Sequence, residues 1–454
     1  MKDVSISIKN LVFGILHLHQ VGELMQESEQ RALPTTGSLT GIFEALEFFR
    51  DPAFAKRRFD RHGNVFETSM FGQPMVFIQG AQAISDLLSQ SDVIEGWWPE
   101  SVRQLLGSYS LANRNGTSHK ARRRVISQLF SAAALQSYSS GIIDMVDNLT
   151  FELKTAKAPF PLADKIRNFA FSVIASTVLG LEGSDRDELF SDFEIWSRAL
   201  FSVPIALPGS PFFKALQARK RLTLRLQDVL AHPIKGKGGL DLLSGGLDEV
   251  GIPFTDEDLV EQLLLLLFAG YETTSSALSC LIRELLINPS VETWLREEVD
   301  LLSWPPLREK ATIAYDPNNA PRLDATVREV MRLTPPVGGF FRRTKRSLVI
   351  DGVVVPENRV IQVALNASNR YGIGDLETFR PERHFEDDCS VTLIPFGSGE
   401  RVCLGKSLAE LEIRLMIVGL FSQLRLEAIP HQDLSLQQLP SPTPRDGLLV
   451  KVRK

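Results

Sequence analysis

The sequence predicts a mainly α-helical protein with small β-sheets, organised as one large domain. Apolar residues recur at three- and four-residue spacing through most of residues 81–300 and again after residue 405, which indicates helices. Short segments of strand-forming residues at 65–78 and 348–363 indicate small sheets. The 454 residues contain no internal repeat, low-complexity linker or sharp change of composition. We therefore expect one domain over residues 31–454, preceded by an N-terminal extension over residues 1–30.

Composition and charge narrow the class of protein. With 44% hydrophobic and 23% charged residues, the chain has the composition of a soluble globular protein. Its net charge of −5 gives no reason to expect nucleic-acid binding. Cysteine occurs three times, at 280, 389 and 403, without a CxxC pair, and the seven histidines show no zinc-binding spacing. A reducing compartment such as the cytoplasm fits this use of cysteine.

The N-terminus contains an apolar segment, residues 11–21, that resembles a membrane anchor at first sight. It is short and contains His17 and His19, whereas a membrane span needs about 20 mostly apolar residues. No small-residue cleavage site follows it, which argues against a signal peptide. We therefore expect a soluble protein, with peripheral membrane association through this segment left open.

The elements follow in order along the chain. Residues 41–59 have helical spacing, and residues 65–71 and 74–78 flank Gly72-Gln73 as a hairpin. The helical region is interrupted at residues 97–99, 203–211 and 236–251, where proline or glycine accumulates. Strands return at 348–355 and 360–363, and residues 448–452 resemble the edge of a hairpin.

A long helix is predicted in the middle of the sequence. Thr255 is a capping residue followed by three acids, and Asn288-Pro289 ends the helix at Ile287. At ~1.5 Å per residue this helix is roughly 50 Å long, and leucine on all its sides predicts burial. Inside it stands Ala269-Gly-Tyr-Glu-Thr-Thr274. A glycine, an acid and two hydroxyl residues in a buried helix contradict local preference, as happens at functional sites.

Cys403 lies in the loop Phe396-Gly-Ser-Gly-Glu-Arg-Val-Cys-Leu-Gly405, directly before a segment with helical spacing. Glycines at 397, 399 and 405 can adopt positive φ and offer backbone N–H groups without a Cβ. A cysteine at the N-terminus of a helix ionises more readily because of the unpaired N–H groups and the helix dipole. A buried free cysteine in an ordinary turn is the alternative.

This loop resembles the haem-binding signature of the cytochrome P450 family at Phe396, Gly397, Gly399, Arg401, Cys403 and Gly405. The resemblance implies the cytochrome P450 fold, a single large domain that encloses haem b. It makes Cys403 the axial thiolate ligand of the iron and places Arg401 at a haem propionate. A thiolate ligand favours cleavage of the O–O bond.

Other segments resemble the same family. Ala269, Gly270, Glu272 and Thr273 match its oxygen-activation motif. In that motif the glycine leaves room for substrate and dioxygen, the threonine hydrogen-bonds the oxygen and the acid relays protons. A polar kink in a structural helix is the alternative, and Tyr271 is expected to serve packing.

Charged residues of this chain also match two supporting groups of the family. Glu329, Arg332 and Arg383 match a buried charge network that braces the cysteine loop. His119, Arg123 and Arg342 match groups that hold the haem propionates, with a solvated basic face as the alternative for the first two. For Arg122 and Arg124 we expect that solvated face.

The substrate and partners follow only from the resemblance. Segments 116–124, 264–273 and 332–342 resemble the retinoic-acid-hydroxylating branch and its cyanobacterial relatives, which implies a long apolar isoprenoid, a retinoid or carotenoid derivative, with one polar end. Hydroxylation of a fatty acid or sterol, and a non-catalytic haem protein, are the alternatives. Mostly apolar residues are expected to line the pocket, with core packing as the alternative for each: Trp97, Trp98, Phe201, Leu266, Val337, Gly338, Phe340, Pro442 and Thr443.

The resemblance also implies an electron donor of the ferredoxin or flavodoxin type. We expect it to dock near Lys406 on a monomeric enzyme that uses O2.

Overall fold

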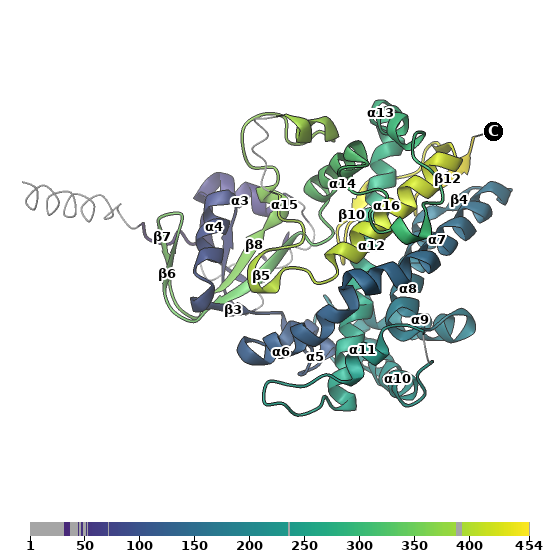
Figure 1. Cartoon of the computed structure of the whole chain (residues 1–454). Helices are drawn as coiled ribbons and strands as arrows, with labels where there is room; N and C mark the ends of the chain where they lie inside the picture. Colours follow the sequence, from purple (N-terminus) through teal and green to yellow (C-terminus); the bar gives the residue numbers. More distant parts are fainter. Residues whose placement is uncertain are drawn as a thin grey trace, which may run out of the picture.

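The computed structural model describes residues 31–36, 44, 47, 48, 51, 53–70, 72–234, 237–386 and 393–453. The expected N-terminal extension, its apolar segment 11–21 and Cys389 lie outside the described residues. Within the described part, the prediction of a helical body with small sheets is confirmed (Figure 1). Figure 1 shows the largest sheet with α3 and α4 on one side of the molecule and most of the helices on the other.

The helices occupy most of the chain between residues 81 and 333. Their bounds are α3 Phe54–His62, α4 Ala81–Ser89, α5 Glu100–Leu106, α6 Gly116–Ile126, α7 Ala132–Thr155, α8 Leu162–Ile174, α9 Gly183–Ser197, α10 Pro211–Ala231, α11 Leu240–Ser244, α12 Asp256–Ile287, α13 Pro289–Val299, α14 Pro321–Leu333, α15 Leu365–Ser368 and α16 Lys406–Gln423. The expected helix over 41–59 does not run unbroken to Phe59. The carboxylate of Asp51 accepts a hydrogen bond from the Ala53 amide, and this turn precedes α3.

The largest sheet has five strands in the order β1-β2-β8-β5-β3. Its strands are β1 Val65–Met70, β2 Gln73–Ile78, β3 Ile94–Gly96, β5 Gly339–Thr344 and β8 Val360–Ala364. The predicted hairpin is confirmed as β1 and β2, with Val65 opposite Ile78. β2 and β8 are parallel, and the remaining pairs are antiparallel.

Three smaller sheets complete the fold. They are formed by β6 Leu348–Ile350 with β7 Val353–Val355, by β10 Leu436–Gln437 with β11 Thr443–Pro444, and by β4 Phe160–Pro161, β12 Leu449–Val452 and β9 Leu426–Ala428. The expectation that the C-terminal strand is an edge is wrong, because β4 and β9 pair with β12 from its two sides. Two-residue strands such as β4 carry no periodic signal in the sequence.

Helix α12 is buried along most of its length, as predicted, although Ala269 in its middle is exposed. Thr255 caps it by accepting a hydrogen bond from the Asp258 amide at 3.2 Å. The helix packs against α8, α10, α14 and α16. Among the described residues it alone is long and apolar enough to cross a membrane, and its apolar stretch is mostly buried inside the protein. Burial in a core therefore explains its leucines.

Candidate functional site

The loop before α16 presents Cys403. Gly397 and Gly399 both have φ of +69°, a conformation that disfavours side chains with a Cβ. The Cys403 amide donates to the carbonyl of Phe396 at 2.9 Å and closes the loop. Gly405, by contrast, has φ of −81° and caps the helix. The expectation of positive φ therefore fits the first two glycines and not Gly405.

The surroundings of Cys403 act on its thiol in opposite directions. Burial is the largest effect and raises the pKa of Cys403 overall, although the amides of Gly405 and Lys406 and the charge of Arg123 act to lower it. The side chain is nevertheless accessible to solvent. Many protein atoms surround the sulphur, but none of them covers it directly. A ligand can therefore reach the sulphur. A thiolate held by N–H groups and a cation can bind a metal.

Four basic residues around this loop lack acidic partners. His119 and Arg123 lie on α6, Arg342 on β5 and Arg401 in the loop, and none of them forms an ion pair within the described part of the chain. Burial and the neighbouring Arg401 lower the pKa of Arg342 to about 10. Burial, with Arg401 and Arg123, lowers the pKa of His119 to about 4. Such a cluster is costly unless a bound anion compensates it.

The backbone around Arg401 leaves space for its guanidinium. A Cβ on Gly96 would lie 2.3 Å from the guanidinium carbon of Arg401, so a side chain there would displace the guanidinium from this position. Arg401 donates to the carbonyl of Arg114 and the side chain of Asn115. Asn115 also accepts from the Gly96 amide at 2.8 Å and so connects β3 to α6. Sequence analysis missed Gly96 and Asn115, although Asn115 directly precedes the basic segment.

These residues fit a haem. A sulphur ligand stands beside cations that have no carboxylate of their own, and a haem carries two propionates besides its iron. Arg123 in addition donates to the carbonyl of Val402 at 2.6 Å, which ties α6 to the cysteine loop. No group of three or more His, Cys, Asp or Glu residues is suited to hold a bare metal ion among the residues that the structure describes.

The polar segment of α12 faces a cavity. Thr273 donates its hydroxyl hydrogen to the Ala269 carbonyl at 2.7 Å, and both side chains are at least partly exposed. Glu272 is buried, and burial raises its pKa against the opposing charges of Arg167 and Arg198. Tyr271 is fully buried among aromatic rings, as expected, and its hydroxyl accepts from Arg167 at 2.8 Å. Sequence analysis missed both arginines, because nothing local connects them to α12.

Gly270 has a different role from the one expected. A Cβ at this position would lie 2.9 Å from Cγ1 and Cδ1 of Ile174 on α8. The glycine therefore permits close packing of α12 against α8. The expectation that Gly270 leaves room for substrate and dioxygen is wrong, and the exposed residue of this turn is Ala269.

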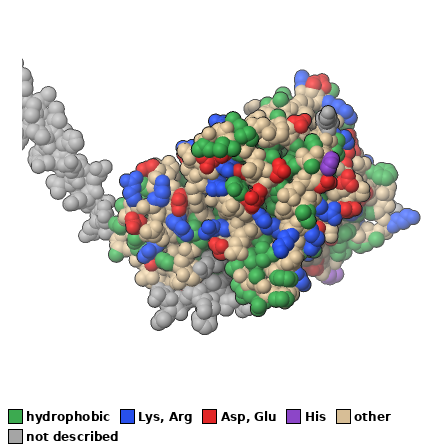
Figure 2. All heavy atoms as spheres, turned by 90° about the horizontal axis from the view of Figure 1, so that it is seen from below, with side chains coloured by type: hydrophobic (Ala, Val, Ile, Leu, Met, Phe, Trp, Pro, Cys, Tyr) green, Lys and Arg blue, Asp and Glu red, His purple; other side chains and the backbone are tan. Residues whose placement is uncertain are grey.

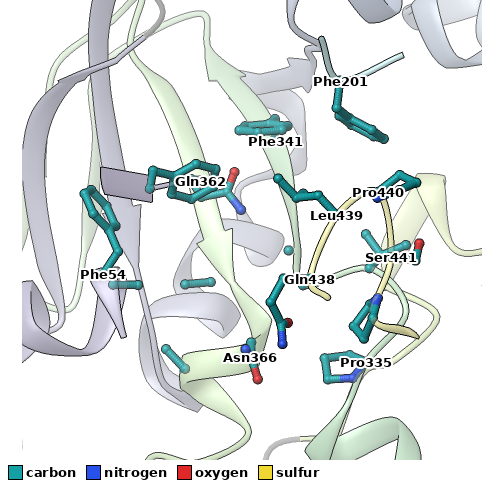
Figure 3. Close-up of a pocket in the computed structure, with 18 of the residues that line it drawn as sticks. Phe54, Phe201, Pro335, Phe341, Gln362, Asn366, Gln438, Leu439, Pro440 and Ser441 are labelled. Carbon is teal, nitrogen blue, oxygen red and sulfur yellow. The ribbon is translucent and has the colours of Figure 1, made fainter. Parts of the chain in front are cut away.

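A cavity of about 1840 Å³ extends from α12 to the five-stranded sheet. Figure 3 shows Phe54, Gln362 and Phe341 in one wall, opposite Phe201, Leu439 and Pro440. Of the residues expected to line a pocket, six do so: Trp97, Trp98, Phe201, Val337, Gly338 and Pro442.

For three residues of that set the expectation is wrong. Leu266 is buried in the core, Phe340 packs against the core beside the sheet, and Thr443 lines a smaller cavity of about 270 Å³. Phe340 precedes Phe341 on β5, and successive strand residues face opposite sides. The sequence did not reveal which of the two would face the cavity.

The structure brings Glu329, Arg332 and Arg383 together with almost no exposure. Glu329 accepts two hydrogen bonds from Arg332, at 2.8 and 2.9 Å, and one from Arg383 at 2.9 Å. Burial opposes ionisation of Glu329, but Arg332, His384 and the Arg380 amide hold its pKa well below the usual value. His384, at 3.0 Å from the carboxylate, was missed although it follows Arg383 directly.

Two neighbouring arginines of α6 differ in their surroundings. Arg124 is exposed, as expected. Arg122 is not on a solvated face, because it is buried and paired with Asp258 and Glu249. The acids that pair with it are more than a hundred residues away in the sequence, so the local pattern misled the prediction.

On the side shown in Figure 2, acidic and basic side chains are interspersed. This distribution agrees with the net charge of −5.

Comparison with known proteins gives consistent results. The family model described as Cytochrome P450 matches residues 33–451. Cytochrome P450 120 of Synechocystis sp. is 33% identical over 434 residues, which cover 92% of this chain and 96% of that protein. Cytochrome P450 26B1 of Mus musculus is 31% identical, with 88% and 82% covered. The structure of retinoic-acid-bound cyanobacterial CYP120A1 superposes with a TM-score of 0.85 at 31% identity, covering 94% of this chain and 100% of that one.

Proposed function

Because the chain belongs to the cytochrome P450 family, and is therefore a haem-thiolate monooxygenase, we propose that it hydroxylates a C–H bond of a lipophilic isoprenoid of the retinoid type. Retinoic acid is the first candidate, and a carotenoid-derived compound is the second. The observation that carries this proposal is the likeness, along nearly the whole chain, to a structure that holds retinoic acid. The large cavity with aromatic and aliphatic walls supports it.

Cys403 is the proposed axial ligand of the haem. Haem bound through a thiolate supplies the chemistry that activates dioxygen. The chain holds the sulphur in position through the Phe396 carbonyl and the amides that open α16. Arg123, Arg342 and Arg401 would balance the charge of the propionates, since these three form no ion pair among the described residues, and His119, which its pKa of about 4 leaves neutral, would donate an N–H group.

Glu272 and Thr273 are the proposed proton-handling pair. The raised pKa of Glu272 favours a carboxyl group that holds a proton and can release it. Glu272 lines both the main cavity and the smaller one that contains Arg167 and Arg198, so it stands between two spaces. The Thr273 hydroxyl, tied to the Ala269 carbonyl, keeps its oxygen available as an acceptor in the main cavity.

As a monooxygenase of this family, the enzyme takes electrons from a redox partner and binds O2 and a lipophilic substrate. We propose a ferredoxin or flavodoxin as donor, docking near Lys406 at the start of α16. A cytoplasmic monomer, with one domain over residues 31–454, fits this proposal.

Two optical measurements test the function. The reduced holoenzyme with carbon monoxide should show the red-shifted Soret band of thiolate-bound haem. Titration of the ferric form with all-trans-retinoic acid should shift the Soret band, and turnover with a donor system should give a monohydroxylated product. A correct carbon monoxide band without any response to retinoids would contradict the substrate and favour a fatty acid or sterol instead.

A further inference from the structure

One face of the five-stranded sheet contributes polar groups to an otherwise apolar cavity wall. In the antiparallel pairing of β5 and β8, Phe341 lies opposite Gln362, and Arg343 lies opposite Val360. Residues two apart on a strand share a face, as do directly opposite residues. Phe341, Arg343 and Gln362 therefore point to the same side, and all three line the cavity.

Gln362 is a buried amide with unused hydrogen-bonding capacity. Its side chain is 6% exposed, and its Oε1 accepts no hydrogen bond from any residue in the described ranges. Its Nε2 donates at 3.3 Å to the carbonyl of Val363, which leaves its second hydrogen free. A Cβ on Gly339 would lie 2.1 Å from the Val363 carbonyl oxygen and 2.3 Å from this nitrogen, so the glycine allows the close approach of β8 and leaves space for the amide. Figure 3 shows the amide nitrogen on the side of Leu439 and Gln438.

Arg343 is a cation without an anion. Its guanidinium carbon lies 5.9 Å from the centre of the Trp97 ring, and the side chain makes no hydrogen bond or ion pair with the residues that the structure describes. Glu95 is opposite Arg343 on β3 but forms no ion pair with it. Another cavity-lining arginine, Arg370, is in contrast fully engaged with Glu377, Asn366 and the Leu333 carbonyl. Among the described arginines on this face of the sheet, Arg343 is therefore available to a ligand.

From this we infer that Arg343 and the Gln362 amide bind the carboxylate of an elongated apolar substrate, whose apolar body extends along the aromatic wall toward Thr273. A guanidinium and an N–H group on one sheet face offer the charge-assisted donors that a carboxylate requires. The aromatic residues between the sheet and α12 suit a long hydrocarbon. This inference rests on the proposed function and defines the orientation of the substrate in that site.

The experiment compares acids with the matching alcohols. The ferric holoenzyme is titrated optically with all-trans-retinoic acid and all-trans-retinol, and with palmitic acid and hexadecanol, in the wild type, Arg343→Gln and Gln362→Leu. The control is Arg346→Gln, which removes the same charge from an exposed residue paired with Asp92. Intact carbon monoxide spectra show that each variant has folded and bound haem.

Arg343→Gln should raise the Kd of the acids at least about tenfold, equivalent to about 1.4 kcal/mol, and that of the alcohols less than about twofold. Gln362→Leu should also weaken the acids selectively, and Arg346→Gln should change neither. Equal effects of Arg343→Gln on acid and alcohol, or no effect on the acid, would overturn the inference, as would a wild type that binds no acid at all. Binding of palmitic but not retinoic acid would refute the retinoid substrate, while the palmitic acid and hexadecanol pair still decides the carboxylate site.

Discussion

Arg332→Ala tests whether the buried network supports haem binding. Arg332 is fully buried and donates two hydrogen bonds to Glu329, and further ones to the carbonyls of Asn369 at 3.0 Å, Leu376 at 2.7 Å and Thr378 at 3.3 Å. It therefore fastens the segment before the cysteine loop to α14. The alanine variant leaves the Glu329 carboxylate with fewer donors and the carbonyl of Leu376 without its arginine.

Removing one partner of a buried charge pair costs about 3–5 kcal/mol. This is a large share of the roughly 5–15 kcal/mol that stabilises a typical folded protein. We expect Arg332→Ala to give insoluble protein or soluble protein without haem. The ratio of Soret to 280 nm absorbance measures haem content, and denaturant unfolding measures the free energy of unfolding.

Arg328→Ala is the matched control for this measurement. Arg328 lies one helical turn earlier on α14, is exposed and forms no ion pair in the described structure. This variant should load haem like the wild type. Soluble Arg332→Ala with a full complement of haem and an unchanged free energy of unfolding would refute the reasoning.

Four further predictions concern single side chains. Cys403→Ser should abolish the red-shifted carbon monoxide band, whereas Cys280→Ser, which changes a buried thiol elsewhere, should keep it. Thr273→Ala should lower product formed per electron pair by at least about tenfold and release peroxide, because a positioned proton relay contributes roughly 10²–10⁴-fold; unchanged coupling would contradict that role. Gly270→Ala should destabilise the protein by about 1–3 kcal/mol through its clash with α8, measured by denaturant unfolding, with retained retinoid binding. Burial raises the pKa of Glu412 well above its usual value. The folded state therefore keeps a proton that the unfolded state loses, and the stability of the fold falls as pH rises above the unfolded pKa of about 4.3. Glu412→Gln should for this reason raise Tm at about pH 8 more than at about pH 5.

The sequence predicts well what depends on local periodicity and chain order. The bounds of α12 follow from Thr255 and Asn288-Pro289, and the hairpin of β1 and β2 follows from Gly72-Gln73. Contacts between distant segments are not readable in the same way. Arg343 and Gln362 share a face only through the register of β5 and β8, and nothing in either strand alone specifies it.

Gly270 shows how a correct motif can be given a wrong physical reason. The residue type fits a glycine position in a resembled motif, so space for a ligand was the expected explanation. The structure instead places Ile174 of α8 where a Cβ would stand. Sequence cannot separate these two causes, because both require a missing Cβ and differ only in what lies opposite.

The buried arginines of this protein divide by whether the chain itself supplies their anions. Arg332 and Arg122 have carboxylates among their partners, so their burial is compensated within the fold and assigns them to its architecture. Arg342 and Arg401 are largely enclosed and form no ion pair among the described residues, although Glu400 and Glu95 act on Arg401 from farther away, and burial lowers the pKa of both. A folded chain gains nothing from enclosing uncompensated cations, so these two arginines require an anion from outside the chain. Their position beside Cys403 makes the haem propionates the anion that we propose for them, and Arg343, which lies on the cavity face of β5 without an ion pair among the described residues, is the place where the proposed substrate would bring a second one.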